Sequence, residues 1–337
     1  MYLVTGASGT MGKAVLVEIA RSGSEHRAMY RSYTKAAEAP AGTPTVIADF
    51  SKKDTLPPAL EGIHSVYLVC SPIPQLIELE WNMIDACVTA GVGHIVLSSA
   101  MGAREWRKSF PSWHRRVEDK LKSTKMSFTI LRPNMFHQNV LTYFAPSIRS
   151  QRVFHSSMGN ARVSFLDVRD IAAVAAKSLA GGEHSGQTYE LNGPEALTYS
   201  ELAAKIAEHS GRDTQYVDIP AEKQRQAMLD RGMPEWQADA LLDLHAYYLK
   251  GKGGKIDGLL EQLLGRPPIT MDLFLAEFAT EFRAEPEASV PAHAPAQSEA
   301  PAPANVPAEL KSQPGAPVAA KAKPQTEARP QADAASA

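Results

Sequence analysis

The fold is decided by the stretch Thr5-Gly6-Ala7-Ser8-Gly9-Thr10-Met11-Gly12. It follows the short apolar run 3–5 and precedes 13–21, a segment of helical length rich in apolar residues. Glycines let a backbone turn tightly and approach a pyrophosphate, and the helix that follows presents unpaired N–H groups to the anion. The G-x-x-G-x-x-G spacing between a strand and a helix therefore predicts a dinucleotide site, with a purely structural tight turn as the alternative. The residues assigned to the cofactor here are Thr5, Gly6, Ser8, Gly9, Thr10, Met11 and Gly12.

Outward from this turn, apolar runs alternate with segments of helical length. The runs are 26–31, 45–48, 65–70, 94–98 and 128–131, and the clearest helical segments between them are 74–90 and 113–123. Strands that alternate with helices indicate a parallel sheet covered on both faces. The predicted fold class is α/β, a Rossmann-type doubly wound parallel sheet with a smaller C-terminal substrate region.

The pattern loosens after Leu131, and this marks the predicted boundary between two regions. Later segments include the helix 170–179, the strand 188–191, the helix 199–210 with Thr198 as its cap, and the helix 235–249. The glycine-rich stretch 250–254 that follows is predicted to be a mobile link. We expect a dinucleotide-binding domain over 1–155, a small substrate or lid region over 156–283 that completes the same unit, and a tail over 284–337.

The last 54 residues differ from the rest in composition. They hold ten of the 24 prolines and no Phe, Trp or Tyr, too little bulky apolar surface to offset the entropy of ordering a chain. A disordered Ala/Pro-rich tail is predicted. Without its four basic and six acidic residues, the remainder carries 31 of each, and this neutrality argues against nucleic acid as a partner.

Other classes of protein are disfavoured by what the sequence lacks. The chain enters its first apolar run directly after Met1, with no leader pattern, and no window holds the roughly 18 apolar residues of a membrane helix. Cys70 and Cys87 form no CxxC, the ten histidines are scattered, and no H-E-x-x-H occurs. We expect a soluble, cytoplasmic protein without a metal, either a monomer or a homodimer.

Residues at the ends of later strands extend the predicted cofactor site. Arg31 and Ser32 close the second strand, where a guanidinium accommodates a 2′-phosphate, so NADP(H) is favoured over NAD(H). A solvated strand end is the alternative for Arg31. Asp49 and Phe50 would lie beside the adenine, or else serve as an ordinary cap and a core ring. The other residues assigned to the cofactor are Cys70, Ser71, Ser98 and Pro133.

Taken together, these residues resemble the NmrA-like group of atypical short-chain dehydrogenases/reductases. The resemblance rests on the glycine turn, Arg31, and the motifs 48–50, 98–99, 131–134, 167–171, 191–193 and 265–268, with Phe274 and Phe278 beyond, and covers about 1–283. It implies a Rossmann domain with a small C-terminal substrate region and a bound nicotinamide dinucleotide. Members of the group are either reductases or redox-sensing regulators.

The usual catalytic pair of short-chain dehydrogenases, Tyr-x-x-x-Lys on one helix face, is absent. The corresponding helix offers His114-x-x-x-Glu118, and no tyrosine lies between Tyr67 and Tyr143. His114 is a candidate general acid that Glu118 would orient and charge, and Ser99 is a candidate to hold a substrate oxygen. The alternative is an exposed i,i+4 pair of helix-stabilising side chains.

A substrate pocket is predicted from the stretch that follows Pro133. It combines polar handles with aromatic surface, and each member has a place in the core as its alternative. The candidates are Asn134, Phe136, His137, Tyr143 and Phe154, with Trp236, Leu244, Tyr247 and Tyr248 covering the same region or a subunit contact. We expect an NAD(P)H-dependent reductase acting on an activated small organic acceptor of quinone, enone or imine type. A non-catalytic redox-sensing regulator is the alternative.

Overall fold

The computed structural model describes residues 1–105 and 108–283. The chain divides into two compact units, Met1–Ala288 and Ser289–Ala337, and every described residue belongs to the first. The predicted disordered tail, 284–337, lies outside the described residues.

A seven-stranded parallel sheet forms the centre of this unit, in the order β3-β2-β1-β4-β5-β6-β8. The strands are β1 (Tyr2–Val4), β2 (His26–Tyr30), β3 (Thr45–Ile47), β4 (Ser65–Leu68), β5 (His94–Ser98), β6 (Ser127–Pro133) and β8 (Gln187–Leu191). The predicted α/β class and the positions of all seven strands are confirmed. From β1, the strands β2 and β3 follow on one side, and β4, β5, β6 and β8 follow on the other side. The carboxyl ends of β1 and β4 therefore lie at a topological switch point.

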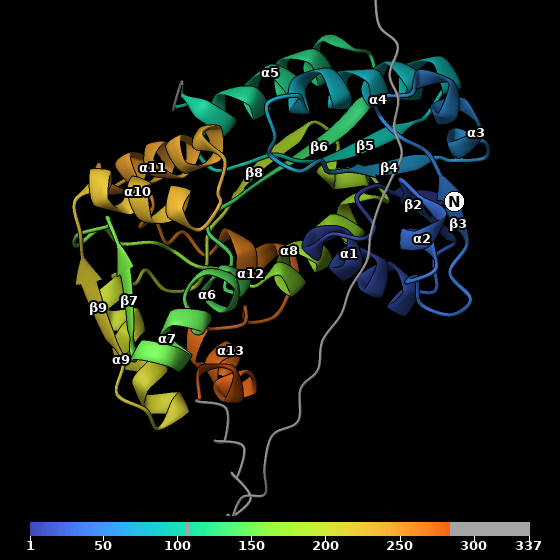
Figure 1. Ribbon diagram of the computed structural model, residues 1–337. Coiled ribbons are helices and arrows are strands. Elements are labelled where there is room, and N and C mark those ends of the chain that lie inside the picture. Colours follow the sequence, from blue (N-terminus) through green and yellow to red (C-terminus); the bar gives the residue numbers. More distant parts are fainter. Residues whose placement is uncertain (106–107, 284–337) are drawn as a thin grey trace, which may run out of the picture. The chain divides into compact units, whose positions relative to one another are not determined.

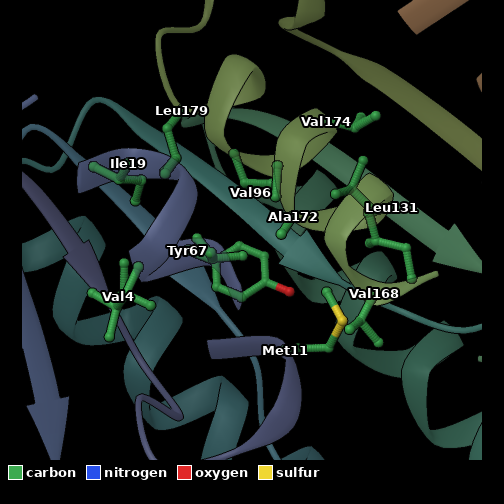
Figure 2. Close-up of a cluster of buried hydrophobic side chains, with 14 of the residues drawn as sticks. Val4, Met11, Ile19, Tyr67, Val96, Leu131, Val168, Ala172, Val174 and Leu179 are labelled. Carbon is green, nitrogen blue, oxygen red and sulfur yellow. The ribbon is translucent and has the colours of Figure 1, made fainter. Parts of the chain in front are cut away.

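Alternating side chains on each strand build two core layers, one on each face of the sheet. On β4, for example, Tyr67 faces one layer, whereas Val66 and Leu68 face the other. The helices α1 (Thr10–Arg21) and α8 (Val168–Ser178) cover the Tyr67 face, and α3 (Leu56–Leu60), α4 (Leu76–Ala90) and α5 (Ser109–Ser123) cover the opposite face (Figure 1). Figure 2 shows the first layer, where side chains of β1, β4, β5 and β6 lie beside those of α1 and α8.

The smaller region has its own core around a two-stranded parallel sheet. Its strands are β7 (Val153–Ser156) and β9 (Gln215–Asp218), neither of which the sequence pattern predicted. Its helices are α6 (Gln138–Tyr143), α7 (Ala145–Gln151), α9 (Tyr199–Ser210), α10 (Ala221–Asp230), α11 (Glu235–Leu249) and α13 (Met271–Glu277). The predicted cap of α9 is confirmed, because Thr198 and Glu201 form a reciprocal capping box.

The remaining elements are short connections. They are α2 (Tyr33–Ala36), α12 (Leu259–Leu264), and the 3-10 turns η1 (Lys53–Thr55), η2 (Gly182–His184) and η3 (Ala279–Phe282).

Two predictions about organisation are wrong. The boundary at 155/156 assigned α8 and β8 to the smaller region, but α8 packs on α1 and β8 pairs with β6 in the main sheet. The stretch 250–254 is not a mobile link. The Gly253 carbonyl accepts hydrogen bonds from the Ser164 amide (2.8 Å) and the Asn134 side chain (2.9 Å), and a Cβ at this position would meet Tyr248 at 2.1 Å.

Candidate active site at the carboxyl edge of the sheet

The glycine turn between β1 and α1 has room for nothing larger than glycine at two points. Gly6 has a φ of +57°, and a Cβ there would approach Val69 Cγ1 to 2.8 Å. A Cβ on Gly12 would lie 2.2 Å from the Gly6 carbonyl oxygen, so the first turn of α1 packs directly on the loop. Gly9 caps α1 without a side-chain hydrogen bond, which leaves the first N–H groups of the helix open to a ligand. This cradle fits a pyrophosphate.

A cavity of about 1110 Å³ runs along the carboxyl edge of the sheet from this turn into the smaller region. Thirteen of the fifteen residues predicted for the cofactor line it. They are Gly6, Ser8, Gly9, Thr10, Met11, Gly12, Arg31, Asp49, Phe50, Cys70, Ser71, Ser98 and Pro133.

Two predicted cofactor residues lie outside the cavity lining, and both side chains have structural tasks. The Thr5 hydroxyl is fully buried, accepts a hydrogen bond from the Val69 amide (2.9 Å) and lies 3.0 Å from the Tyr67 carbonyl oxygen. It thereby ties the end of β1 to β4. Ser32 is exposed and caps α2 by accepting a hydrogen bond from the Lys35 amide. The assignment of the buried Thr5 side chain to the cofactor is therefore wrong, whereas that of the exposed Ser32 side chain stays a prediction.

At one end of the cavity, Arg31 and Asp49 lie at the ends of β2 and β3. Arg31 is exposed. Asp49 accepts hydrogen bonds from the backbone amide (2.9 Å) and the hydroxyl (2.8 Å) of Ser51. The hydrogen bond from the backbone amide is the main reason why the pKa of the Asp49 carboxyl lies below its usual range. Arg31 contributes to the same shift by charge attraction. This end therefore presents a cation beside an ionised carboxylate.

Toward the other end, Ser99 and Glu118 are joined in a buried polar cluster. Ser99 Oγ donates to Glu118 Oε1 (2.7 Å), and Arg132 donates to both carboxylate oxygens, from Nε (2.8 Å) and Nη2 (2.7 Å). Burial alone would raise the pKa of Glu118, but the hydrogen bonds from Arg132 and Ser99 outweigh it and hold the pKa below its ordinary value. Glu118 is therefore ionised at neutral pH. Ser99 lines the cavity, and Glu118 does not.

His114 lines the same end of the cavity, but it has neither of the environments that the sequence suggested. It is not exposed, since only 6% of its surface is accessible. Glu118 does not orient it, because no hydrogen bond joins the two residues and both carboxylate oxygens are used by Ser99 and Arg132. Burial lowers the pKa of His114 to about 4, an effect that the Glu118 charge only partly opposes. The imidazole is neutral near pH 7.

Of the residues predicted for the substrate, Phe136, Tyr143 and Asn134 line the cavity. The Asn134 side chain, however, has its hydrogen bonds filled. Its nitrogen donates to Asn192 Oδ1 and to the Gly253 carbonyl, and its oxygen accepts from the Met135 amide and the Tyr248 hydroxyl. It fixes the junction between the sheet and the smaller region, so it has no free donor for a substrate.

The other two predicted substrate residues, His137 and Phe154, lie in the core. Neither has any accessible surface, and neither lines the cavity. His137 lies 5.3 Å from the ring of Phe274, measured between centroids, and 3.8 Å from an Asp167 oxygen. Phe154 stacks on Phe144 at 4.5 Å. For both, the core alternative holds and the substrate prediction is wrong.

The sequence pattern missed much of the wall opposite the sheet, which comes from α10 and α11. Trp236, Leu244 and Tyr248 line the cavity, which agrees with the alternative that they cover the substrate region. Tyr247 lies outside the lining. The additional residues from this part of the chain are Gln224, Met228, Arg231, Met233, Gln237, Ala240, Leu241 and His245. The amphipathic spacing of α11 was the available signal for a helix, but it does not show which surface the helix covers.

Contacts with α5 hold α11 over the cavity. The Ser109 hydroxyl at the start of α5 donates to the Asp243 carboxylate in the middle of α11. The rings of Trp113 and Trp236 lie 6.4 Å apart between centroids. On the cavity side of α11, His245 Nδ1 is 2.9 Å from the Ser157 hydroxyl, and burial lowers the pKa of His245 to about 4. The cavity thus has a second neutral imidazole in its wall.

Within 1–105 and 108–283, no group of three or more His, Cys, Asp or Glu side chains could hold a metal ion. No helix in the same ranges is both long and apolar enough to cross a membrane.

Comparison with known proteins gives a consistent result. The model of the NmrA-like family matches residues 2–268. The NAD(P)H azoreductase of Xenophilus azovorans is 35% identical over 290 residues, which cover 84% of this chain and 100% of the relative. The NADPH-dependent quinone oxidoreductase of Escherichia coli, solved in complex with NADPH, is 28% identical with a TM-score of 0.76 and covers 83% of this chain and 99% of its own.

A third neighbour shares the fold alone. The triphenylmethane reductase of a Citrobacter species is 23% identical with a TM-score of 0.73, covering 82% of this chain and 98% of that one. With a family match along most of the folded unit and a close relative aligned over its full length, the resemblance seen in the sequence is confirmed, and the chain belongs to the NmrA-like family.

Proposed function

We propose that this NAD(P)H-dependent reductase prefers NADPH and passes hydride to an activated, conjugated acceptor of the quinone or azo-dye kind. One observation carries the proposal: a single cavity joins the glycine turn to an apolar pocket between the sheet and α10–α11. The reductase names of relatives that align with most of this chain support the same chemistry. An enzyme is favoured over a redox-sensing regulator on this ground.

The cofactor would lie along the carboxyl edge with its pyrophosphate on the first turn of α1. Gly6 and Gly12 provide the close approach, and the open N–H groups of the helix provide hydrogen bonds. Arg31 would pair with a 2′-phosphate, because a guanidinium binds phosphate oxygens through two donors. A reduced nicotinamide, when bound, supplies the hydride.

The acceptor pocket lies beyond the nicotinamide end and is mainly apolar. Phe136, Tyr143 and Trp236 provide aromatic walls. Met228, Met233 and Leu241 add flexible apolar surface, which adapts to acceptors of different outline. Arg231 is the one fully charged side chain that the described chain contributes to this end of the lining. Flat, extended ring systems fit such a pocket.

The missing Tyr-x-x-x-Lys bears on which acceptors react. His114 and His245 are neutral at physiological pH and are therefore weak acids, so a plain ketone would find no ready proton donor in these two imidazoles. A quinone or an azo group delocalises the charge that hydride addition creates. We therefore expect activated acceptors to be reduced much faster than simple carbonyl compounds.

The remaining expectations stay predictions. We propose a small-molecule substrate without a nucleic acid partner, a monomer or homodimer, and a cytoplasmic location.

Turnover measurements test the function. NADPH oxidation, followed at 340 nm, should proceed with quinones and azo compounds and should be undetectable with a saturated ketone such as cyclohexanone. Enones and imines extend the panel. Measurable NADPH binding without oxidation by any acceptor would contradict the proposal and would favour the regulator.

A further inference from the structure

Three side chains from different elements form the buried cluster that ends at Ser99, and Glu190 and Arg104, each about one-third exposed, border it. Glu118 on α5 has no accessible surface, and Ser99, directly after β5, is 5% exposed. Arg132 on β6 binds Glu118 through two nitrogens and reaches Glu190 on β8 with a third, at 3.1 Å. A second guanidinium, that of Arg104, lies 3.4 Å from Glu118 Oε2. The carboxylate is therefore clamped from several sides.

This clamp fixes where the Ser99 proton lies. An ionised carboxylate can only accept hydrogen bonds, so the 2.7 Å contact between Ser99 Oγ and Glu118 Oε1 must use the hydroxyl hydrogen of Ser99. A serine hydroxyl has one hydrogen and two lone pairs. Since its hydrogen is directed at Glu118, Ser99 presents only lone pairs to the cavity.

The position of Ser99 along the sheet indicates which part of a dinucleotide it meets. Arg31 and Asp49 follow β2 and β3, and the glycine turn follows β1. Ser99 follows β5, two strands beyond β1 on the other side. A dinucleotide with its pyrophosphate on the turn and its adenosine toward Arg31 directs its nicotinamide half toward β5. That half carries hydrogen-bond donors in its carboxamide NH2 group and its ribose hydroxyls.

We propose that Ser99 is a hydrogen-bond acceptor for the nicotinamide half of the cofactor, and that Glu118 and Arg132 are positioning residues that enforce this polarity. This reverses the role suggested by the sequence, in which Ser99 holds a substrate oxygen. The proposal rests on cofactor use by the reductase, and it assigns the cluster a task in binding rather than in proton transfer.

The substitution Glu118→Gln reverses the polarity without changing the shape of the side chain. Oε2 faces two guanidinium groups, whereas Oε1 faces one nitrogen of Arg132 and the Ser99 hydroxyl. The amide NH2 of a glutamine therefore takes the Oε1 position, where it opposes fewer donors. There it donates to Ser99, whose own hydrogen is then free to face the cavity, where it opposes the donor on the cofactor.

Equilibrium titration tests this with two ligands, NADPH and 2′,5′-ADP, which lacks the nicotinamide half. Ser99→Ala and Glu118→Gln should each weaken NADPH binding by roughly three- to tenfold, the worth of one hydrogen bond. The double variant should be no weaker than either single variant, because both remove the same interaction. Affinity for 2′,5′-ADP should stay within about twofold of wild type in all three.

Glu190→Gln is the matched control, since it removes a carboxylate from the same Arg132, but Glu190 is not hydrogen-bonded to Ser99 and does not itself line the cavity. It should bind NADPH as wild type does. Repeating the Ser99→Ala comparison with the reduced 3-acetylpyridine analogue, which lacks the carboxamide NH2, identifies the donor. The effect vanishes if the donor is the carboxamide and persists if it is a ribose hydroxyl.

Three results would overturn the proposal: wild-type NADPH affinity in Ser99→Ala or Glu118→Gln, losses that multiply in the double variant, or an equal loss of 2′,5′-ADP binding. Failure of the wild-type protein to bind NADPH would instead contradict the proposed function.

Discussion

Arg31 is the residue on which the choice between NADPH and NADH depends. Replacing it with aspartate puts an anion where the 2′-phosphate would bind, and should weaken NADPH binding by at least about tenfold while changing NADH affinity less than threefold. Fluorescence titration with both cofactors measures this. Lys35→Gln is the control, because Lys35 pairs with Glu38 on the surface at 2.7 Å and does not line the cavity. Equal effects on both cofactors would show that Arg31 is only a solvated strand end.

At this scale, the sequence is most informative where the constraint is local. Gly6 and Gly12 pack against each other and are only six residues apart in the chain, so their spacing in the sequence is enough to predict the turn. Whether Asn134 faces a ligand or the protein depends on Tyr248 and Gly253, more than a hundred residues later in the chain. The composition of 133–155 gives no signal for such distant partners, so the sequence does not distinguish Asn134, His137 and Phe154 from residues of a substrate pocket.

At the scale of elements, α11 closes the acceptor end, and one polar contact to α5 holds it there. Asp243→Ala removes the acceptor for the Ser109 hydroxyl. We expect a several-fold increase in KM for a quinone acceptor, because the α11 side chains in the lining lie at the acceptor end, and an unchanged Kd for NADPH. Steady-state kinetics and NADPH titration of the same preparation provide both values.

Asp239→Ala is the matched control for this prediction. Asp239 lies on the same helix and pairs with Arg225 at 2.7 Å on the surface, a type of contact that contributes little. Both constants should remain as in wild type. A weaker NADPH affinity in Asp243→Ala would mean that α11 organises the cofactor site as well.

The elements themselves were largely predictable, and their placement was not. The sequence predicts a helix over 235–249, and α11 has these bounds. The strands β7 and β9 are four residues each and pair with each other across sixty residues, so neither has a pattern distinguishable from a loop. The return of β8 to the main sheet is likewise a long-range pairing, and the boundary at 155 failed for that reason.

At the scale of the whole molecule, one buried acid links stability to pH. Glu80 on α4 has no accessible surface, and neither of its oxygens has a hydrogen-bond partner among the described residues. Burial raises the pKa of Glu80 well above its ordinary value, an effect that the nearby Cys70 amide only partly opposes. The folded protein keeps the proton of Glu80 at pH values where the unfolded chain has released it. The free energy of unfolding therefore decreases as pH rises above the unfolded-state pKa of Glu80.

Glu80→Gln removes this titration. Near pH 4 the variant and the wild type should unfold with similar free energies. As pH rises above the unfolded-state pKa of about 4.3, the free energy of unfolding of the variant should increase relative to that of the wild type by about 1.4 kcal/mol per pH unit. This trend should end where the carboxyl of Glu80 ionises in the folded protein. Urea unfolding between pH 4 and 8 measures the difference. Glu78→Gln is the control, at an exposed position on the same helix, and should show no such pH-dependent difference. A pH-independent difference for Glu80→Gln would mean that Glu80 is ionised in the folded protein.

The central claim is that one cavity brings a bound NADPH and an activated, conjugated acceptor together. A single-turnover experiment tests it most directly: the protein saturated with one equivalent of NADPH is mixed under anaerobic conditions with excess quinone, and absorbance at 340 nm is followed. We predict loss of the signal equivalent to the bound NADPH, at a rate that rises and saturates with quinone concentration. An unchanged signal, or a rate equal to that of free NADPH with the same quinone, would contradict the account.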